Sequence, residues 1–140
     1  MQNQNSVSKK ITFGFLLAGL YNLTGILVPT KCFTDQTLAT IDPVVFSWLG
    51  QVGIILWGLA YLSVSIRYHQ VPKLILVFFI EKWVYVAAWA YWLMNNGDAL
   101  VNLWNENLFL GIFFAIYGAG DFLFALFFGY VFIKTRHQTQ

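Results

Sequence analysis

The chain has 140 residues, of which 59% are hydrophobic, 19% aromatic and only 10% charged, and its mean hydropathy is +0.64. A soluble domain carries about 25% charged residues and leaves a large share of its surface in water, so this composition excludes an ordinary soluble protein. The length allows one membrane domain, residues 1–140, with the lipid bilayer as its main partner. The net charge of +2 gives no indication of nucleic-acid binding.

Four long apolar runs follow one another along the chain and predict four membrane-spanning helices. They cover residues 11–28, 44–66, 74–94 and 108–133. The first run is long for a secretory signal and no small-residue cleavage site follows it, so we expect a retained helix that ends at Pro29. Asp42 and Pro43 predict the start of the second helix, as its N-cap and first helical residue. Residues 29–43 and 99–107 are expected to be connections on the outer side.

The basic residues are distributed unevenly between the two sides of the predicted bundle. One side carries most of them, namely Lys9, Lys10, Arg67, Lys73, Lys134 and Arg136. The other side has Lys31 beside the acidic residues Asp35, Asp42, Asp98 and Glu106. By the positive-inside rule, both termini are expected in the cytoplasm. The sequence therefore predicts an all-α integral membrane four-helix bundle, multi-pass, in a bacterial inner membrane.

Small residues recur at helical spacing in three of the runs. The rows are Gly14 and Ala18, then Gly50 and Gly58, then Gly111, Ala115 and Ala119. In lipid, helices associate through close backbone approach at such positions, so these rows predict the faces on which the helices pack.

Three ionisable side chains lie inside the apolar runs. Glu81 and Lys82 are in the third run, and Asp121 is at the midpoint of the fourth. A charge at the bilayer centre costs about 2.5–3.5 kcal/mol on insertion scales, so each of them needs a partner. Glu81 is about 10–12 Å from the cytoplasmic end of its helix, close to the level of Asp121 in the antiparallel neighbour. We therefore expect an ion pair between Lys82 and Asp121, while Glu81 finds another partner or carries a proton.

Other polar side chains in the runs extend this group into a candidate ligand pocket or proton site. Its members are Asn22, Gln51, Glu81, Lys82, Tyr85, Tyr117 and Asp121. Tyr85 and Tyr117 lie one helical turn from the charged residues, whereas Asn22 and Gln51 are expected nearer the outer leaflet. Two interpretations stay open, a functional site and a buried ion pair that only sets the register of the helices.

The residue patterns that usually indicate metal binding or catalysis do not occur in this sequence. His69 and His137 stand in the basic segments without a Cys or acidic partner at ligand spacing, so we expect neither a metal nor a haem. Cys32 has no neighbouring histidine, and as the only cysteine it excludes an intrachain disulfide. We therefore expect no cofactor-binding residues and no enzymatic activity by this chain alone.

Glycine-rich stretches in the second and fourth runs carry a resemblance to a known group. The second run contains LGQVGIILWGLAYL, and the fourth contains YGAGDFLFALFF, with Gly118, Gly120, Asp121 and Ala125 at the positions of a Gly-x-Gly-Asp-x-x-x-Ala pattern. In length, helix number and these stretches, the chain resembles the DoxX-like small bacterial four-helix membrane proteins. The resemblance implies a membrane subunit connected with quinone redox chemistry, and it identifies no catalytic residue.

Three functions stay open at this point. The first is an accessory or binding subunit whose pocket holds a lipophilic or quinone-like small molecule, within a homo-oligomer or a larger membrane complex. The second is a proton- or ion-coupled transporter or channel component, in which Glu81 and Asp121 change protonation. The third is a structural assembly subunit. The four-helix multidrug exporters place their key acid in the first helix, and the first run here contains none.

Overall fold

The computed structural model describes residues 7–136, and every regular element within that range is helical. The elements are α1 (Lys9–Leu27), α2 (Thr37–Ile41), α3 (Trp48–Val64), the 3₁₀ helix η1 (Tyr68–Gln70), α4 (Pro72–Asn95), α5 (Gly97–Glu106) and α6 (Leu108–Arg136). Helices α1, α4 and α6 are long and apolar enough to cross a membrane, and α3 is apolar but shorter, with 17 residues. The prediction of a helical chain is confirmed, and the long helices agree with a multi-pass membrane protein.

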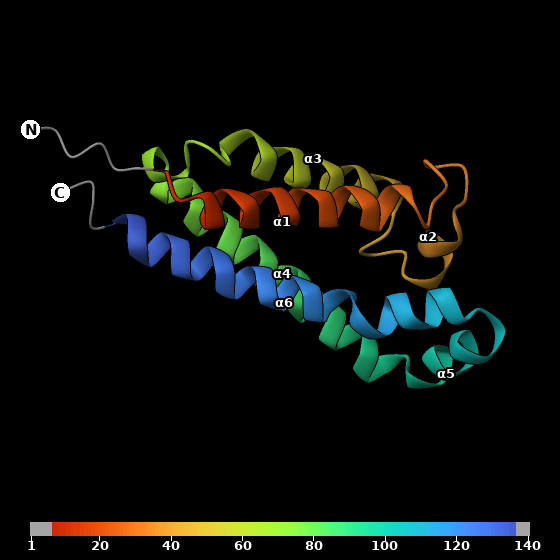
Figure 1. The fold of residues 1–140 in the computed structure, drawn as a ribbon. Coiled ribbons are helices and arrows are strands. Elements are labelled where there is room, and N and C mark those ends of the chain that lie inside the picture. Colours follow the sequence, from red (N-terminus) through yellow and green to blue (C-terminus); the bar gives the residue numbers. More distant parts are fainter. Residues whose placement is uncertain (1–6, 137–140) are drawn as a thin grey trace, which may run out of the picture.

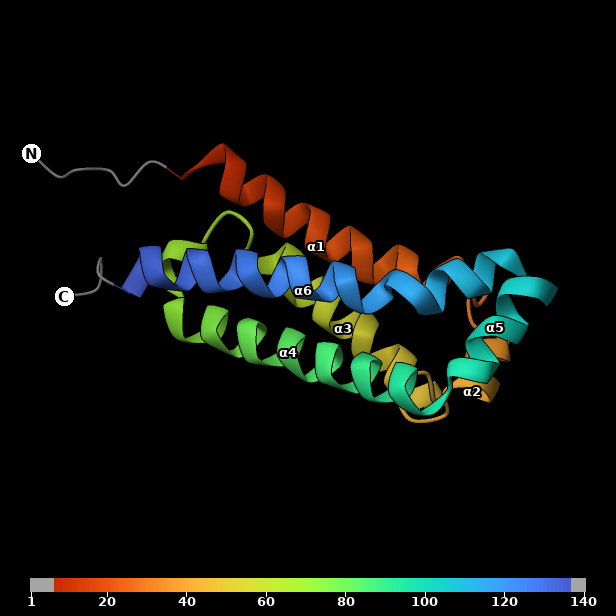
Figure 2. The same cartoon turned by 90° about the horizontal axis from the view of Figure 1, so that it is seen from below.

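The four apolar helices lie side by side as two pairs (Figure 1, Figure 2). Helix α1 packs along α3 and α4 packs along α6, whereas α1 and α6 touch over a short stretch only. The start of α1 and the end of α6 lie at one end of the molecule, which we call the terminal end (Figure 1). Helices α2 and α5 lie at the opposite end, where α5 rests against α6.

The second apolar run begins its helix later than the sequence predicts. Ser47 is the N-cap of α3, because its hydroxyl accepts a hydrogen bond from the backbone N–H of Gly50 at 3.1 Å. Asp42 instead accepts hydrogen bonds from the backbone N–H groups of Val44 and Val45, at 3.0 and 3.1 Å, within a turn. The predicted helix start at Asp42 was wrong because an aspartate that closes a turn has the same local signature as an N-cap. Both outer connections also contain a short helix, α2 in one and α5 in the other.

The small-residue face of α3 packs on α1. A Cβ atom added to Gly58 would lie 3.0 Å from the carbonyl oxygen of Gly19 and 3.0 Å from the Cβ of Asn22, so the two backbones approach as closely as a glycine permits. The amide of Asn22 donates a hydrogen bond to the carbonyl oxygen of Ile54 at 3.1 Å. This contact fixes the position of Asn22 inside the bundle.

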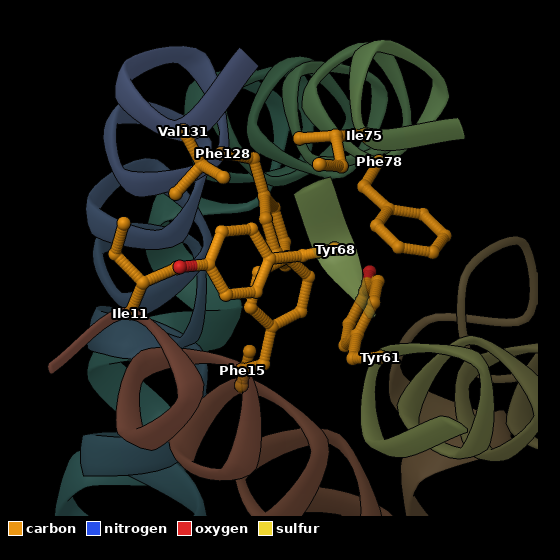
Figure 3. Packing of buried hydrophobic residues seen from close by; sticks show 9 residues of the cluster. Ile11, Phe15, Tyr61, Tyr68, Ile75, Phe78, Phe128 and Val131 are labelled. Atoms are coloured by element: carbon orange, nitrogen blue, oxygen red, sulfur yellow. The ribbon is translucent and has the colours of Figure 1, made fainter. Parts of the chain in front are cut away.

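Aromatic and aliphatic side chains fill the terminal end of the bundle, directed towards one another from α1, α3, η1, α4 and α6 (Figure 3). This aromatic cluster consists of Ile11, Phe15, Ala18, Tyr61, Tyr68, Ile75, Phe78, Phe128 and Val131. Phe15, Phe78 and Phe128 are fully buried. The ring centroid of Phe128 lies 5.4 Å from the centroid of Phe15 and 5.5 Å from the centroid of Phe78. Rings at these separations pack favourably and leave no room for water between them.

A second apolar cluster occupies the half of the bundle nearer α2 and α5. It consists of Ile26, Leu38, Val45, Phe46, Trp92, Leu110, Phe114 and Tyr117. Along α1, α4 and α6 alike, buried polar residues separate the members of the two clusters: Asn22 on α1, Glu81 and Lys82 on α4, and Asp121 on α6. The fold therefore holds a polar layer between two apolar layers.

Candidate functional site

The ammonium group of Lys82 is the centre of the polar layer. Its Nζ lies 2.6 Å from Oδ1 of Asp121 and 2.9 Å from Oδ1 of Asn22. The rings of Tyr61 and Tyr21 flank it, with centroids 5.2 and 5.8 Å from Nζ. Lys82 is 1% exposed. The predicted ion pair is thus present, and hydrogen bonding and cation–π contact complete the surroundings of the charge.

Glu81 occupies the same layer but makes no ion pair in the described part of the chain. Its Oε2 accepts a hydrogen bond from the hydroxyl of Tyr61, which α3 contributes. Glu81 is only 7% exposed, and its Oε1 is buried without a hydrogen-bond partner among residues 7–136. Adjacent residues on a helix point about 100° apart, which explains how Lys82 faces Asp121 while Glu81 turns to Tyr61. One oxygen of a buried carboxylate is therefore left for something else to contact.

A pocket of about 640 Å³ ends at this polar layer. Its walls come mainly from α1 and α6, and its polar floor includes Glu81, Lys82 and Asp121. The remaining wall is almost wholly apolar, with Ile54, Ile112, Ile116 and Leu123 among its members, and with several aromatic rings. Ile116 and Leu123 are more than half exposed, so the pocket opens on the flank of the bundle, beside the stretch where α1 and α6 meet.

Six of the residues predicted from the sequence come together at this pocket. Asn22, Glu81, Lys82, Tyr85, Tyr117 and Asp121 all line it. Asn22 was expected at a different depth from the charged residues, and its contact with Lys82 shows that it lies level with them. Gln51 is not in the pocket wall; its amide donates a hydrogen bond to the carbonyl oxygen of Phe46 at 2.9 Å, beneath the α3 cap.

Two tyrosines of the site were missed by the sequence reasoning. Tyr61 binds Glu81, and Tyr21 donates a hydrogen bond to the backbone carbonyl of Tyr117 and flanks Lys82. The signal was present, because a tyrosine hydroxyl inside an apolar run needs a hydrogen-bond partner at membrane depth. The hydroxyl of Tyr117, another residue of the pocket wall, is itself buried without a partner among the described residues.

Metal binding receives no support from the described residues. Within residues 7–136, no three His, Cys, Asp or Glu side chains are close enough to hold a metal ion. His69 lies on η1 at the terminal end, next to Gln70, and it is not part of the pocket wall. Cys32 is exposed in the loop after α1. His137 lies outside the described residues.

Comparisons with protein-family models, with curated proteins and with solved structures found no match to this chain. The chemistry of the pocket follows from its own side chains. An apolar concavity of about 300–1,000 Å³ with a few convergent polar groups is the usual form of a small-molecule site. The carboxylate of Glu81 and the hydroxyl of Tyr117 each have a polar atom that makes no hydrogen bond to any residue of the described range 7–136.

Proposed function

We propose that the protein is an integral membrane four-helix bundle that binds a lipophilic small molecule taken up laterally from the bilayer. The observation that carries this proposal is the pocket of about 640 Å³, which opens on the bundle flank and ends at Glu81, Lys82 and Asp121. An apolar wall suits a lipophilic body, and the polar floor suits a single head group. A quinone-like molecule is one ligand with this form, as the resemblance to DoxX-like proteins implies.

The arrangement of charges supports four spans with both termini in the cytoplasm. Lys9, Lys10, Lys134 and Arg136 lie on the helix ends at the terminal end, next to η1, whereas Asp35 and Glu106 lie at the opposite end. This is the asymmetry expected when the terminal end faces the cytoplasm of a bacterium.

Helix α3 is about 25 Å long, slightly less than the bilayer core of about 30 Å. The irregular residues before it can complete the span, because irregular backbone is tolerated at membrane depth where protein buries it. Val45 and Phe46 are 8% and 2% exposed, and Asp42 binds two of the backbone N–H groups there. These contacts support a membrane crossing by residues 43–64.

The aromatic cluster favours a binding site over a continuous channel. The fully buried rings of Phe15, Phe78 and Phe128 lie between the polar layer and the terminal end. A ligand therefore reaches Glu81 and Lys82 from the flank, through the pocket. An accessory subunit that presents its ligand to a partner, in a homo-oligomer or a larger complex, fits this one-sided access.

Filling the pocket tests the proposal. Gly25 lies in the pocket wall, and a Cβ atom there would meet nothing within 4 Å, so Gly25→Phe places a ring in the pocket without a backbone clash. Gly53 has equally open space, also on a helix, but is not in the pocket wall, so Gly53→Phe is the matched control. The assay is binding of radiolabelled dodecanol, a neutral lipophile, to the protein in phosphatidylcholine nanodiscs, with empty nanodiscs subtracted.

Gly25→Phe should weaken dodecanol binding at least tenfold, and Gly53→Phe should leave it unchanged. Equal binding by the parent protein and both variants, or no binding above empty nanodiscs, contradicts the proposal. Circular dichroism and gel filtration establish that both variants are folded before the comparison is made.

A further inference from the structure

We infer that the ligand of the pocket carries a protonated amine as its head group, held by the free oxygen of Glu81. This inference rests on the proposed function, because it names the chemical class of molecule that the same pocket takes. The geometry that carries it is the carboxyl group of Glu81, a residue of the pocket wall: its Oε1 is buried and has no partner among the described residues, and the ammonium of the adjacent Lys82 is already paired.

The charges at the pocket floor do not balance. Among the residues that the structure describes, the pocket wall holds two carboxyl groups, Glu81 and Asp121, and one basic side chain, Lys82. Lys82 and Asp121 neutralise each other at 2.6 Å. Ionised Glu81 leaves one negative charge in an apolar surrounding, where an unpaired charge is costly. A ligand with one positive charge restores neutrality.

The hydrogen bonds select a head group that donates. An ionised carboxylate only accepts, and Oε2 of Glu81 already accepts from Tyr61. The vacant Oε1 therefore requires an N–H or O–H from the ligand. A primary, secondary or tertiary ammonium supplies both the N–H and the charge, and such charge-assisted bonds are about twice as strong as neutral ones. A quaternary ammonium has the charge but no N–H, and a quinone carbonyl could accept from Tyr117 but could not donate to Oε1 of Glu81.

Aromatic rings provide the second feature that a cation needs. Phe46, Tyr85, Phe113 and Tyr117 all contribute to the pocket wall. The face of an aromatic ring attracts a cation within about 6 Å, and more strongly when water is excluded. The protein already uses this contact inside the bundle, where the rings of Tyr21 and Tyr61 flank the Lys82 ammonium.

An anionic head group does not suit the same floor. Lys82 has its ammonium committed to Asp121 and Asn22, at 2.6 and 2.9 Å, so an anion would meet an already neutralised cation. It would also approach the carboxylate of Glu81, which repels it. A divalent cation is unsuited for another reason, since among residues 7–136 no three metal-binding side chains lie together.

The test compares head groups on one hydrocarbon chain. Dodecylamine, dodecanol, dodecanoate and dodecyltrimethylammonium are measured at neutral pH by equilibrium binding to the protein in phosphatidylcholine nanodiscs, with empty nanodiscs subtracted. The variants are Glu81→Gln, which keeps the shape of the side chain and removes its charge, and Glu106→Gln, the same change at an exposed acid on α5 outside the pocket. Gly25→Phe is included to show that binding occurs in the pocket.

Dodecylamine should bind the parent protein at least tenfold more tightly than dodecanol or dodecanoate, and more tightly than the quaternary analogue. Glu81→Gln should remove that preference, and Glu106→Gln should keep it. If dodecanol or dodecanoate binds as tightly as the amine, or if the preference survives Glu81→Gln, the amine assignment is overturned. The comparison of head groups on the parent protein decides the matter even when Glu81→Gln fails to fold.

The same data separate this inference from the proposed function. If all four probes bind with similar affinity and Gly25→Phe abolishes their binding, the pocket is a lipophile site without a preference for amines. If no probe binds above empty nanodiscs, both the site and the assignment of its ligand fail.

Discussion

Replacing Lys82 by methionine removes the ammonium group while keeping a long, unbranched side chain in its place. The substitution leaves the Asp121 carboxylate without its counterion and Oδ1 of Asn22 without its donor, in a site where Lys82 is 1% exposed. Breaking a buried ion pair in this way costs about 3–5 kcal/mol. Proton uptake limits the cost, since an ordinary aspartate is neutralised at pH 7 for about 4 kcal/mol. We therefore expect Lys82→Met to lower the free energy of unfolding by about 3–4 kcal/mol.

Asp121→Leu should lower the free energy of unfolding by less than Lys82→Met does. In this variant the ammonium of Lys82 has lost its carboxylate partner but keeps its hydrogen bond to Asn22 and its contacts with the rings of Tyr21 and Tyr61. Cation–π contacts of this kind contribute about 0.5–2 kcal/mol, so a loss of about 3 kcal/mol or less is expected. The double variant has no unpaired charge from this pair and should lie within about 1 kcal/mol of the parent protein.

A double-mutant cycle measures this non-additivity. The assay is unfolding by SDS in mixed micelles, followed by circular dichroism, on the parent protein, both single variants and the double variant. The double variant should be at least about 3 kcal/mol more stable than the two single changes added together. The exposed pair of Lys31 and Asp35, with an N–O distance of 3.1 Å, is the control and should show no measurable coupling. If the effects of Lys82→Met and Asp121→Leu add within about 0.5 kcal/mol, the ion pair does not hold the bundle together.

Three further substitutions test other contacts. Tyr61→Phe removes the hydroxyl that binds Glu81 and should lower stability in the SDS titration by about 1–2 kcal/mol; an unchanged midpoint contradicts the contact. Gly58→Leu should force α3 away from α1 and cost about 1–3 kcal/mol or more in the same titration. Hydrogen bonds from the hydroxyl and the backbone N–H of Thr37, together with the ammonium of Lys31, lower the pKa of Asp35 to about 2. The ionised form of Asp35 therefore stabilises the loop above about pH 4, and this stabilisation is lost as the pH falls through about 2. Thr37→Val should raise this midpoint in a carbon-13 NMR titration, and an unmoved midpoint refutes the hydroxyl's role.

The charged residues could be placed from the sequence because helix geometry is so regular. Rise per residue and the antiparallel order of neighbouring helices set Lys82 level with Asp121 without any knowledge of the loops. The cost of burying a charge then required that the two meet. Their separation of 2.6 Å agrees with that reasoning.

The partner of Glu81 could not be placed in the same way. Its neighbour Tyr61 belongs to α3, and the level of that helix depends on where it begins. The sequence predicted a start near Asp42, whereas the helix starts at Trp48 after an irregular stretch. The turn that holds Asp42 depends on tertiary packing around Phe46, which is 2% exposed, so no local pattern reveals it. The apolar walls and the opening of the pocket were equally beyond prediction, because they result from the short contact between α1 and α6.

The change in stability when Glu81 is replaced shows whether this acid serves ligand binding or the packing of the helices. If an acid only sets helix register and is fully paired, as Asp121 is, its replacement alone should destabilise the free protein. An ionised acid whose counterion comes from a ligand should instead destabilise the free protein, because a buried charge without a counterion is costly. We therefore expect Glu81→Gln to increase the free energy of unfolding of the ligand-free protein in the SDS titration, by about 1 kcal/mol or more, since the substitution removes the charge and the neutral amide still accepts from Tyr61. Dodecylamine should then stabilise the parent protein and not the variant. A variant clearly less stable than the ligand-free parent would show that Glu81 serves the packing of the bundle.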